Sequence, residues 1–190
     1  MNLIIFGPPG AGKGTQANFI VNKFNLHKLS TGEILRNEIK DKTELGNEIS
    51  SIINAGSLVS DNIVKKLVEN FISNEKYKDR LIFDGYPRNL TQAKTLRELL
   101  SQYSQKIDLV LKLSVSLDTI KKRISERRSL ENRVDDNEET AIKRYKTYER
   151  STEPVIEYYK KLNLLKVIQG ESSIDQINKE ISEIMNNLEG

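Results

Sequence analysis

Residues 7–15 have the sequence GPPGAGKGT and come directly after a short apolar run, Leu3–Phe6. Glycines in such a loop let backbone N–H groups turn inward around phosphate oxygens, and a helix that begins at the loop adds the positive end of its dipole. Lys13 adds a mobile positive charge for the β- and γ-phosphates of a nucleotide. The stretch therefore predicts a strand, a phosphate-binding loop and a helix, with the phosphates held at Gly10, Ala11, Gly12, Lys13, Gly14 and Thr15.

The residue after the lysine departs from the general pattern of nucleotide-binding loops. That pattern places Ser or Thr directly after the lysine as a ligand of Mg²⁺, but here Gly14 comes between Lys13 and Thr15. The sequence therefore leaves open whether the Thr15 hydroxyl contacts the metal.

Five short apolar runs recur along the chain, and each is too short for a helix. Several are aliphatic, which is typical of strands buried on both faces of a parallel sheet. The runs are Leu3–Phe6, His27–Ser30, Leu81–Phe83, Leu109–Leu113 and Leu165–Ile168. Helical periodicity predicts helices at about 17–24, 31–35, 44–53, 60–71, 90–100, 117–126, 137–148, 153–162 and 174–188. Strands that alternate with helices predict an open α/β sheet with right-handed crossovers.

Two local signals mark helix ends in the first third of the chain. Ser30 followed by Glu33 has the pattern of a capping box, in which the two side chains satisfy free N–H groups at a helix start. Gly56 predicts the end of the third helix. Between Thr31 and about Asp61 the sequence offers helices but no strand, which predicts a small helical lobe inserted into the sheet.

Composition narrows the function classes. The chain has 190 residues, no cysteine and one histidine, which excludes disulfides, cysteine-ligated zinc and multi-histidine metal sites. A net charge of +3 is too mild to indicate a nucleic-acid partner, but six of the ten arginines lie between Lys121 and Arg150. The apolar run Leu3–Phe6 is too short for a signal peptide or a membrane span, so we expect a cytoplasmic protein without a membrane partner.

Further motifs give the chain a family resemblance over almost its whole length. They are STGEILR at 30–36, GSLV at 56–59, DGYPR at 84–88 with Gln92, and RVDDN at 133–137. With the loop at 7–15, these motifs resemble those of nucleoside monophosphate kinases, and in particular of the adenylate kinase family. The resemblance implies a P-loop fold in which an open, parallel, five-stranded sheet is flanked by helices. It also implies a monomer with a core at 1–29, 60–126 and 138–190, an NMP-binding lobe at 30–59 and a lid at 127–137.

The lid is expected to be of the short type. Only residues 129–132 separate Arg128 from Arg133, and none of them is a cysteine, so the chain resembles the branch of the family without zinc. Arg128 matches the family less clearly than its neighbours, and we expect it at the surface.

The resemblance assigns roles to particular residues. AMP is expected at Thr31, Arg36, Ser57, Leu58, Val59, Gly85, Tyr86, Pro87, Arg88, Gln92, Arg133 and Arg144. ATP is expected at residues 10–15, at Arg127 and at the backbone around Ser172. The phosphates are expected to be clamped by Lys13, Arg88, Arg123, Arg133 and Arg144. Asp84 ends an apolar strand, where ligands of a parallel sheet gather, and is expected to hold Mg²⁺ directly or through water.

The implied reaction is ATP + AMP = 2 ADP, which serves nucleotide balance, with ATP, AMP and ADP as partners and Mg²⁺ as cofactor. A UMP/CMP kinase is the main alternative, because it shares the loop and the short lid. Gln92 favours AMP, since its amide can both donate to and accept from the adenine edge, whereas the pyrimidine-reading relatives typically carry Asn there. Asn89 nevertheless resembles part of their motif. A nucleotide-binding regulator without catalysis is a third alternative.

Overall fold

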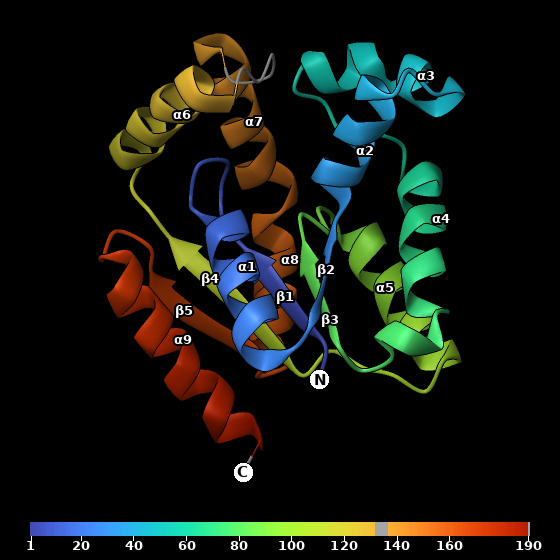
Figure 1. Ribbon diagram of the computed structural model, residues 1–190, viewed down its shortest axis with the longest axis vertical. Helices are drawn as coiled ribbons and strands as arrows, with labels where there is room; N and C mark the ends of the chain where they lie inside the picture. Colours follow the sequence, from blue (N-terminus) through green and yellow to red (C-terminus); the bar gives the residue numbers. More distant parts are fainter. Residues whose placement is uncertain (132–136, 190) are drawn as a thin grey trace.

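Five parallel strands form a sheet in the order β2–β3–β1–β4–β5 (Figure 1). The computed structural model describes residues 1–131 and 137–189. The strands are β1 (Leu3–Phe6), β2 (His27–Ser30), β3 (Leu81–Asp84), β4 (Leu109–Ser114) and β5 (Leu165–Gln169). The predicted α/β fold with a parallel five-stranded sheet is confirmed.

The helices also lie where periodicity predicts them. Within the described residues they are α1 (Lys13–Phe24), α2 (Thr31–Lys40), α3 (Glu44–Asn54), α4 (Asp61–Ile72), α5 (Leu90–Gln102), α6 (Leu117–Glu131), α7 (Glu138–Ser151), α8 (Glu153–Lys161) and α9 (Ile174–Glu189), with a 3₁₀ turn at Glu75–Tyr77. Helix α6 continues past residue 126, where we expected it to end. In 1–131 and 137–189, no helix has the length and apolar character that crossing a membrane requires.

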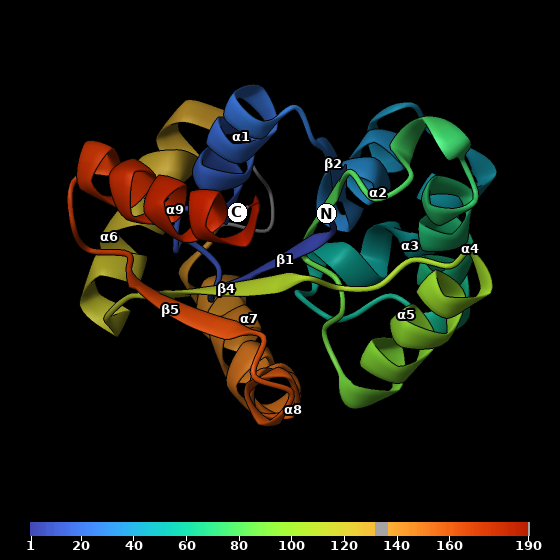
Figure 2. The same ribbon diagram turned by 90° about the horizontal axis from the view of Figure 1, so that it is seen from below.

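Helices cover both faces of the sheet (Figure 2). Helices α1 and α9 pack on one face, where Ile5 and Ile181 belong to one buried cluster. Helices α4, α5 and α8 pack on the other face, where Phe83, Leu96 and Ile156 belong to a second cluster. Each fully buried side chain of this size stabilises the fold by about 1.5–3 kcal/mol. Burial on both faces explains why the strands are nearly continuous apolar runs.

Helices α2 and α3 stand above the carboxyl ends of the strands, opposite α6 and α7 (Figure 1). Residues 31–60, all of which are described, contain these two helices and no strand. Leu35 of α2 and Ile49 of α3 nevertheless belong to the same buried cluster as Phe83 of the sheet. The helical segment is thus packed onto the core, and its division from core and lid remains a prediction.

The capping box predicted for Ser30 and Glu33 is wrong, although α2 begins there. Ser30 is the N-cap residue, but its side chain makes no capping hydrogen bond. Glu33 pairs instead with Lys28, with 2.8 Å between Oε1 and Nζ. The Thr31 hydroxyl donates to the carbonyl oxygen of Gly85 at 3.0 Å. The polar side chains at the start of α2 therefore bond to neighbouring segments rather than to the first N–H groups of the helix.

Helices α2 and α3 meet closely at Gly46. Thr43 caps α3 by accepting from the Gly46 N–H at 3.0 Å, and its hydroxyl donates to Oε2 of Glu38 at 2.5 Å. A Cβ on Gly46 would overlap the carbonyl group of Glu38 and lie 2.7 Å from the nitrogen of Ile39. Any side chain here would force the two helix backbones apart.

We expect Gly46→Ala to lower the free energy of unfolding by about 1–3 kcal/mol, because overpacking moves backbone atoms. Thermal unfolding followed by circular dichroism should show Tm lowered by about 2–4 °C for each kcal/mol. Gly14→Ala is the matched control, because a Cβ on Gly14 meets no atom within 4 Å. A wild-type Tm for Gly46→Ala would contradict the close approach of α2 and α3.

Candidate active site

The predicted phosphate-binding loop connects β1 to α1 at the carboxyl edge of the sheet. Strand β1 pairs with β3 on one side and with β4 on the other, which makes this the switch point where open α/β sheets bind ligands. Gly12, the N-cap residue of α1, has a φ of 92°, a left-handed backbone that glycine adopts without strain. The Ala11 N–H donates to the carbonyl oxygen of Pro8 at 3.1 Å. The first turn of α1 then presents N–H groups that have no acceptor inside the helix.

Lys13 is the first residue of α1. Its ammonium group donates to the carbonyl oxygens of Gly7 at 2.8 Å and Pro8 at 3.1 Å. Burial lowers the pKa of Lys13 to about 8; Asp84 opposes this shift, whereas nearby guanidinium groups, that of Arg88 first, add to it. The ammonium form is thus disfavoured here, and the negative charge of phosphates would favour it again.

A large cleft lies beside the loop and encloses about 1550 Å³, part of it open to solvent. Six cationic and three acidic side chains line it, namely Lys13, Arg36, Arg88, Arg123, Arg127, Arg144, Glu33, Asp84 and Glu126. Arg123 of α6 donates to the carbonyl oxygens of Ala11 at 3.3 Å and Gly170 at 2.9 Å. Arg127 follows one turn later on the same helix. This excess of positive charge suits a polyanion such as a nucleoside triphosphate.

Asp84 ends β3 inside the large cleft and is 8% exposed. It lies close enough to Lys13 to raise the pKa of that residue against the effect of burial. Protein sites for Mg²⁺ typically use one or two carboxylates together with water and substrate phosphates. Asp84 therefore fits a Mg²⁺ ion held mainly by a nucleotide. Across 1–131 and 137–189, no group of three or more His, Cys, Asp or Glu side chains is placed to hold a metal.

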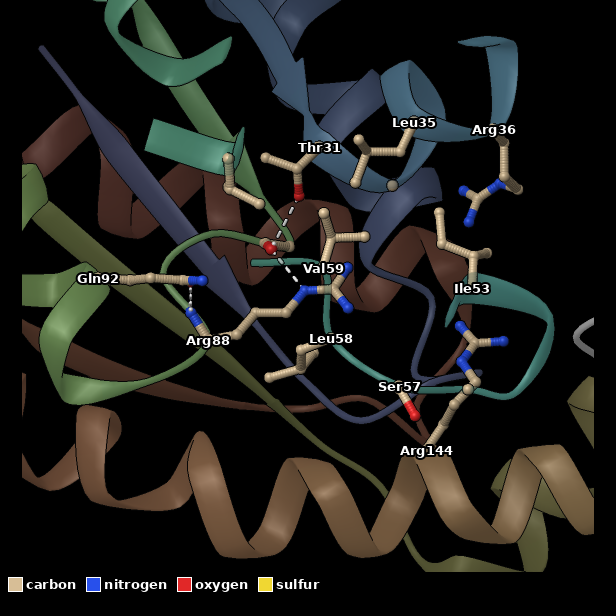
Figure 3. A pocket seen from close by; sticks show the side chains of 14 residues that line it. Thr31, Leu35, Arg36, Ile53, Ser57, Leu58, Val59, Arg88, Gln92 and Arg144 are labelled. Atoms are coloured by element: carbon tan, nitrogen blue, oxygen red, sulfur yellow. Dashed lines mark hydrogen bonds between the residues drawn. The ribbon is translucent and has the colours of Figure 1, made fainter. Parts of the chain in front are cut away.

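A small cleft of about 590 Å³, part of it open to solvent, adjoins the large one. Figure 3 shows Gln92 on one side of it and Arg36 and Arg144 on the other. Nine of the residues predicted for AMP line it, namely Thr31, Arg36, Ser57, Leu58, Val59, Gly85, Arg88, Gln92 and Arg144. The cleft thus combines an apolar wall with an amide on one side and guanidinium groups on the other.

Arg88 is held at three points in the loop after β3. Its N–H donates to Oε1 of Gln92 at 2.7 Å, and its carbonyl oxygen accepts from the Thr152 hydroxyl at 3.0 Å. Its Nε donates to the carbonyl oxygen of Gly85 at 2.7 Å (Figure 3). Both the backbone and the guanidinium group of Arg88 are therefore fixed in place.

Arg36, Arg88 and Arg144 line the large cleft and the small cleft alike. Arg88 and Arg144 also line an inner hollow of about 570 Å³, part of it open to solvent, whose wall includes Phe6, Pro87 and Tyr148. The two clefts therefore meet at three guanidinium groups, two of which also line the inner hollow.

Gln92 is 3% exposed, and both ends of its amide are bound within the protein. Its Oε1 accepts from Arg88, and its Nε2 donates to Oδ1 of Asp61 at 2.7 Å. Asn89 caps α5 by accepting from the Gln92 N–H at 2.8 Å, and it does not line the small cleft. Asn89, which resembles part of the motif of the pyrimidine-reading relatives, therefore serves here as a helix cap.

Other predicted residues lie away from the two clefts. Tyr86 is 1% exposed, and its hydroxyl donates to a backbone carbonyl of α5 at 3.3 Å, so it supports the small cleft from behind. Pro87 lines the inner hollow, and Ala11 is buried beneath the loop. Ser172 lines neither cleft. Arg133 lies outside the described residues.

Sequence reasoning missed part of the small cleft. It missed three apolar lining residues, Leu35, Ile53 and Val64. Leu35 follows Thr31 by four residues, so helical spacing could have placed both on one face. It also missed Asp61, which contacts Gln92 across 31 positions of sequence. No local pattern signals such a contact.

Comparisons with known proteins agree with this geometry. The family model for adenylate kinase matches residues 5–164. An adenylate kinase of Pelagibacter ubique is 46% identical over 97% of this chain and 99% of its own length, in an alignment of 211 positions. One of Flavobacterium psychrophilum is 38% identical over 99% and 100%, and one of Methanothrix thermoacetophila is 36% identical over the whole of both chains. A family model across most of the chain and full-length relatives at these identities leave one conclusion: the chain belongs to the adenylate kinase family.

Proposed function

We propose that this chain transfers the γ-phosphoryl group of ATP reversibly to AMP, giving two ADP. The observation that carries the proposal is the junction of the two clefts at Arg36, Arg88 and Arg144. A phosphoryl group that passes between two nucleotides needs cationic groups that contact it on both sides of the transfer. Membership of the adenylate kinase family supports the same reaction.

The large cleft is the proposed ATP site. The loop at 10–15 and the first turn of α1 offer N–H groups to the phosphates, and Lys13 offers its charge. Arg123 and Arg127 line the same cleft from α6. Mg²⁺ bound with ATP would neutralise charge on the phosphate oxygens, and Asp84 is the residue that would hold it, directly or through water.

The small cleft is the proposed AMP site. The base would lie among its apolar side chains and beside Gln92, while the phosphate would lie toward Arg36, Arg88 and Arg144. Thr31 contributes a hydroxyl that is already bound to the carbonyl oxygen of Gly85. This orientation directs the AMP phosphate toward the large cleft, where the γ-phosphate of ATP would lie.

Positioning and electrostatics account for the proposed catalysis. The phosphoryl group carries charge on its oxygens throughout the transfer, and no covalent enzyme intermediate is needed. Guanidinium groups held in advance stabilise that charge without reorganising at the moment of reaction. Arg88 is held in this way, and we assign the same role to Arg123, Arg133 and Arg144.

Several finer assignments remain predictions. They are the monomeric state, the cytoplasmic location, the short lid at 127–137 without zinc, and the backbone contact of Ser172 with ATP. The UMP/CMP alternative is not favoured, because the small cleft is lined by Gln92, whereas Asn89 caps α5 and does not line it.

A panel of phosphate acceptors tests the proposed function. Steady-state rates with ATP and Mg²⁺ should give the highest kcat/KM for AMP among AMP, GMP, CMP and UMP. A higher kcat/KM for CMP or UMP would overturn the assignment of AMP. Failure to transfer phosphate to any of the four would indicate a nucleotide-binding protein without this activity.

The lowered pKa of Lys13 predicts a pH dependence. In the free enzyme the ammonium group loses its proton as pH rises through about 8, so kcat/KM for ATP should fall above that pH. Bound phosphates favour the charged form, so the corresponding fall in kcat should occur at higher pH. In Lys13→Arg the guanidinium stays charged. The fall of kcat/KM near pH 8 should therefore be absent from this variant, even if its maximal rate is lower. If wild type and Lys13→Arg showed the same pH dependence of kcat/KM, this would contradict the role of Lys13 as the group that titrates near pH 8.

Loss of the Arg88 guanidinium should be severe. We expect Arg88→Ala to lower kcat/KM for AMP by on the order of 100- to 1000-fold, because a fixed group that stabilises developing charge is lost. Arg97→Ala is the matched control, since Arg97 is exposed on α5, the helix that carries Gln92. Equal losses of activity in the two variants, with equally lowered Tm, would point to instability instead.

A further inference from the structure

Asp61 is the first residue of α4 and does not line either cleft. Its Oδ1 accepts from Nε2 of Gln92 at 2.7 Å and from Nδ2 of Asn89 at 3.1 Å. Asp61 is therefore connected to the small cleft by its hydrogen bond to Gln92, which does line that cleft.

The surroundings of Gln92 allow only one orientation of its amide. The Arg88 N–H can only donate, so the amide oxygen must face it. The Asp61 carboxylate can only accept, so the amide nitrogen must face it. A rotation of 180° about the last side-chain bond would oppose two donors at Arg88 and two acceptors at Asp61. Both contacts are partly buried and Gln92 itself is 3% exposed, and a buried polar group left unpaired costs about 1–3 kcal/mol.

One lone pair of Oε1 and one hydrogen of Nε2 remain for a ligand. A 6-amino purine presents an N–H donor at position 6 beside an acceptor at N1. These two groups pair with an amide whose oxygen faces position 6 and whose N–H faces N1. A 6-oxo purine presents an acceptor at position 6 beside an N–H at N1, which is the reverse order. An amide free to rotate would pair with either edge, but a fixed amide pairs with one.

We infer that Asp61 is a specificity-determining positioning residue: by fixing the Gln92 amide, it makes the acceptor site select a 6-amino purine over a 6-oxo purine. The inference rests on the proposed function, in which the base of AMP lies beside Gln92. The preference for a 6-amino purine thus depends on Asp61, which lies outside the cleft, because the amide of Gln92 alone could pair with either purine.

Asp61→Asn tests the inference with little change of shape. An Asn at this position can donate to a rotated Gln92 amide while still accepting from Asn89, so one of the two obstacles to rotation disappears. The probes are AMP and inosine monophosphate, which differ in the order of donor and acceptor at positions 1 and 6. We expect the ratio of kcat/KM for AMP over inosine monophosphate to fall about tenfold, with KM for ATP unchanged. Where turnover of inosine monophosphate is too slow to measure, its inhibition constant against AMP gives the same comparison.

Controls separate this effect from instability. Asn62→Ala changes the exposed neighbour in the same turn of α4 and should leave the ratio unchanged. Asp61→Ser, whose hydroxyl can donate or accept, should lower the ratio as well and replaces Asp61→Asn if that variant does not fold. Equal losses for AMP and inosine monophosphate, or an unchanged ratio, would overturn the inference and leave Asp61 a purely structural role.

Gln92→Leu distinguishes failure of the inference from failure of the proposed function. If the base of AMP lies beside Gln92, this variant should lose kcat/KM for AMP by about tenfold or more. An undiminished value would contradict the proposed AMP site, and the inference would fall with it. A loss in Gln92→Leu together with an unchanged ratio in Asp61→Asn would overturn the inference alone.

Discussion

Repulsion among positive charges is the constraint that the structure has to overcome. Six cationic side chains line one cleft against three acidic ones, and like charges a few ångströms apart repel by about 4 kcal/mol at the effective dielectric of a protein surface. The lowered pKa of Lys13 reports burial and this repulsion together. The folded core supplies the free energy that holds the charges in place, and phosphates relieve the repulsion when they bind. The cost in the empty site thereby becomes affinity for a polyanion.

The frame that holds these charges consists of residues that need not touch a nucleotide. Arg88 is fixed by Gln92 from α5, by Thr152 at the junction of α7 and α8, and by Gly85 from its own loop. Tyr86, two residues before Arg88 in the chain, is buried in the core and donates a hydrogen bond to α5. Substitutions in this frame would change the chemistry without removing a binding group, because they change where the guanidinium lies.

The sequence predicted the elements well because strands buried on both faces leave continuous apolar runs, and amphipathic helices leave their own period. It failed where several partners compete for one polar group. Glu33 suits a helix cap, but Lys28 offers it a charged partner instead. Asp61 and Gln92 are 31 residues apart, and only the packing of α4 against α5 brings them together.

Specificity in such a site depends on what the wrong ligand would leave unpaired. A carboxamide carries a donor and an acceptor at nearly the same place, so alone it can pair with opposite base edges by rotating. Discrimination requires that rotation be costly, and burial of the Gln92 side chain makes it costly because water does not readily replace the partners that the amide would lose. Arg88 takes part twice, since its N–H orients the amide that would face the base while its guanidinium lies where the clefts meet. One residue thus couples recognition of the base to placement of the phosphate, and the rigidity of its loop makes both depend on the same few hydrogen bonds.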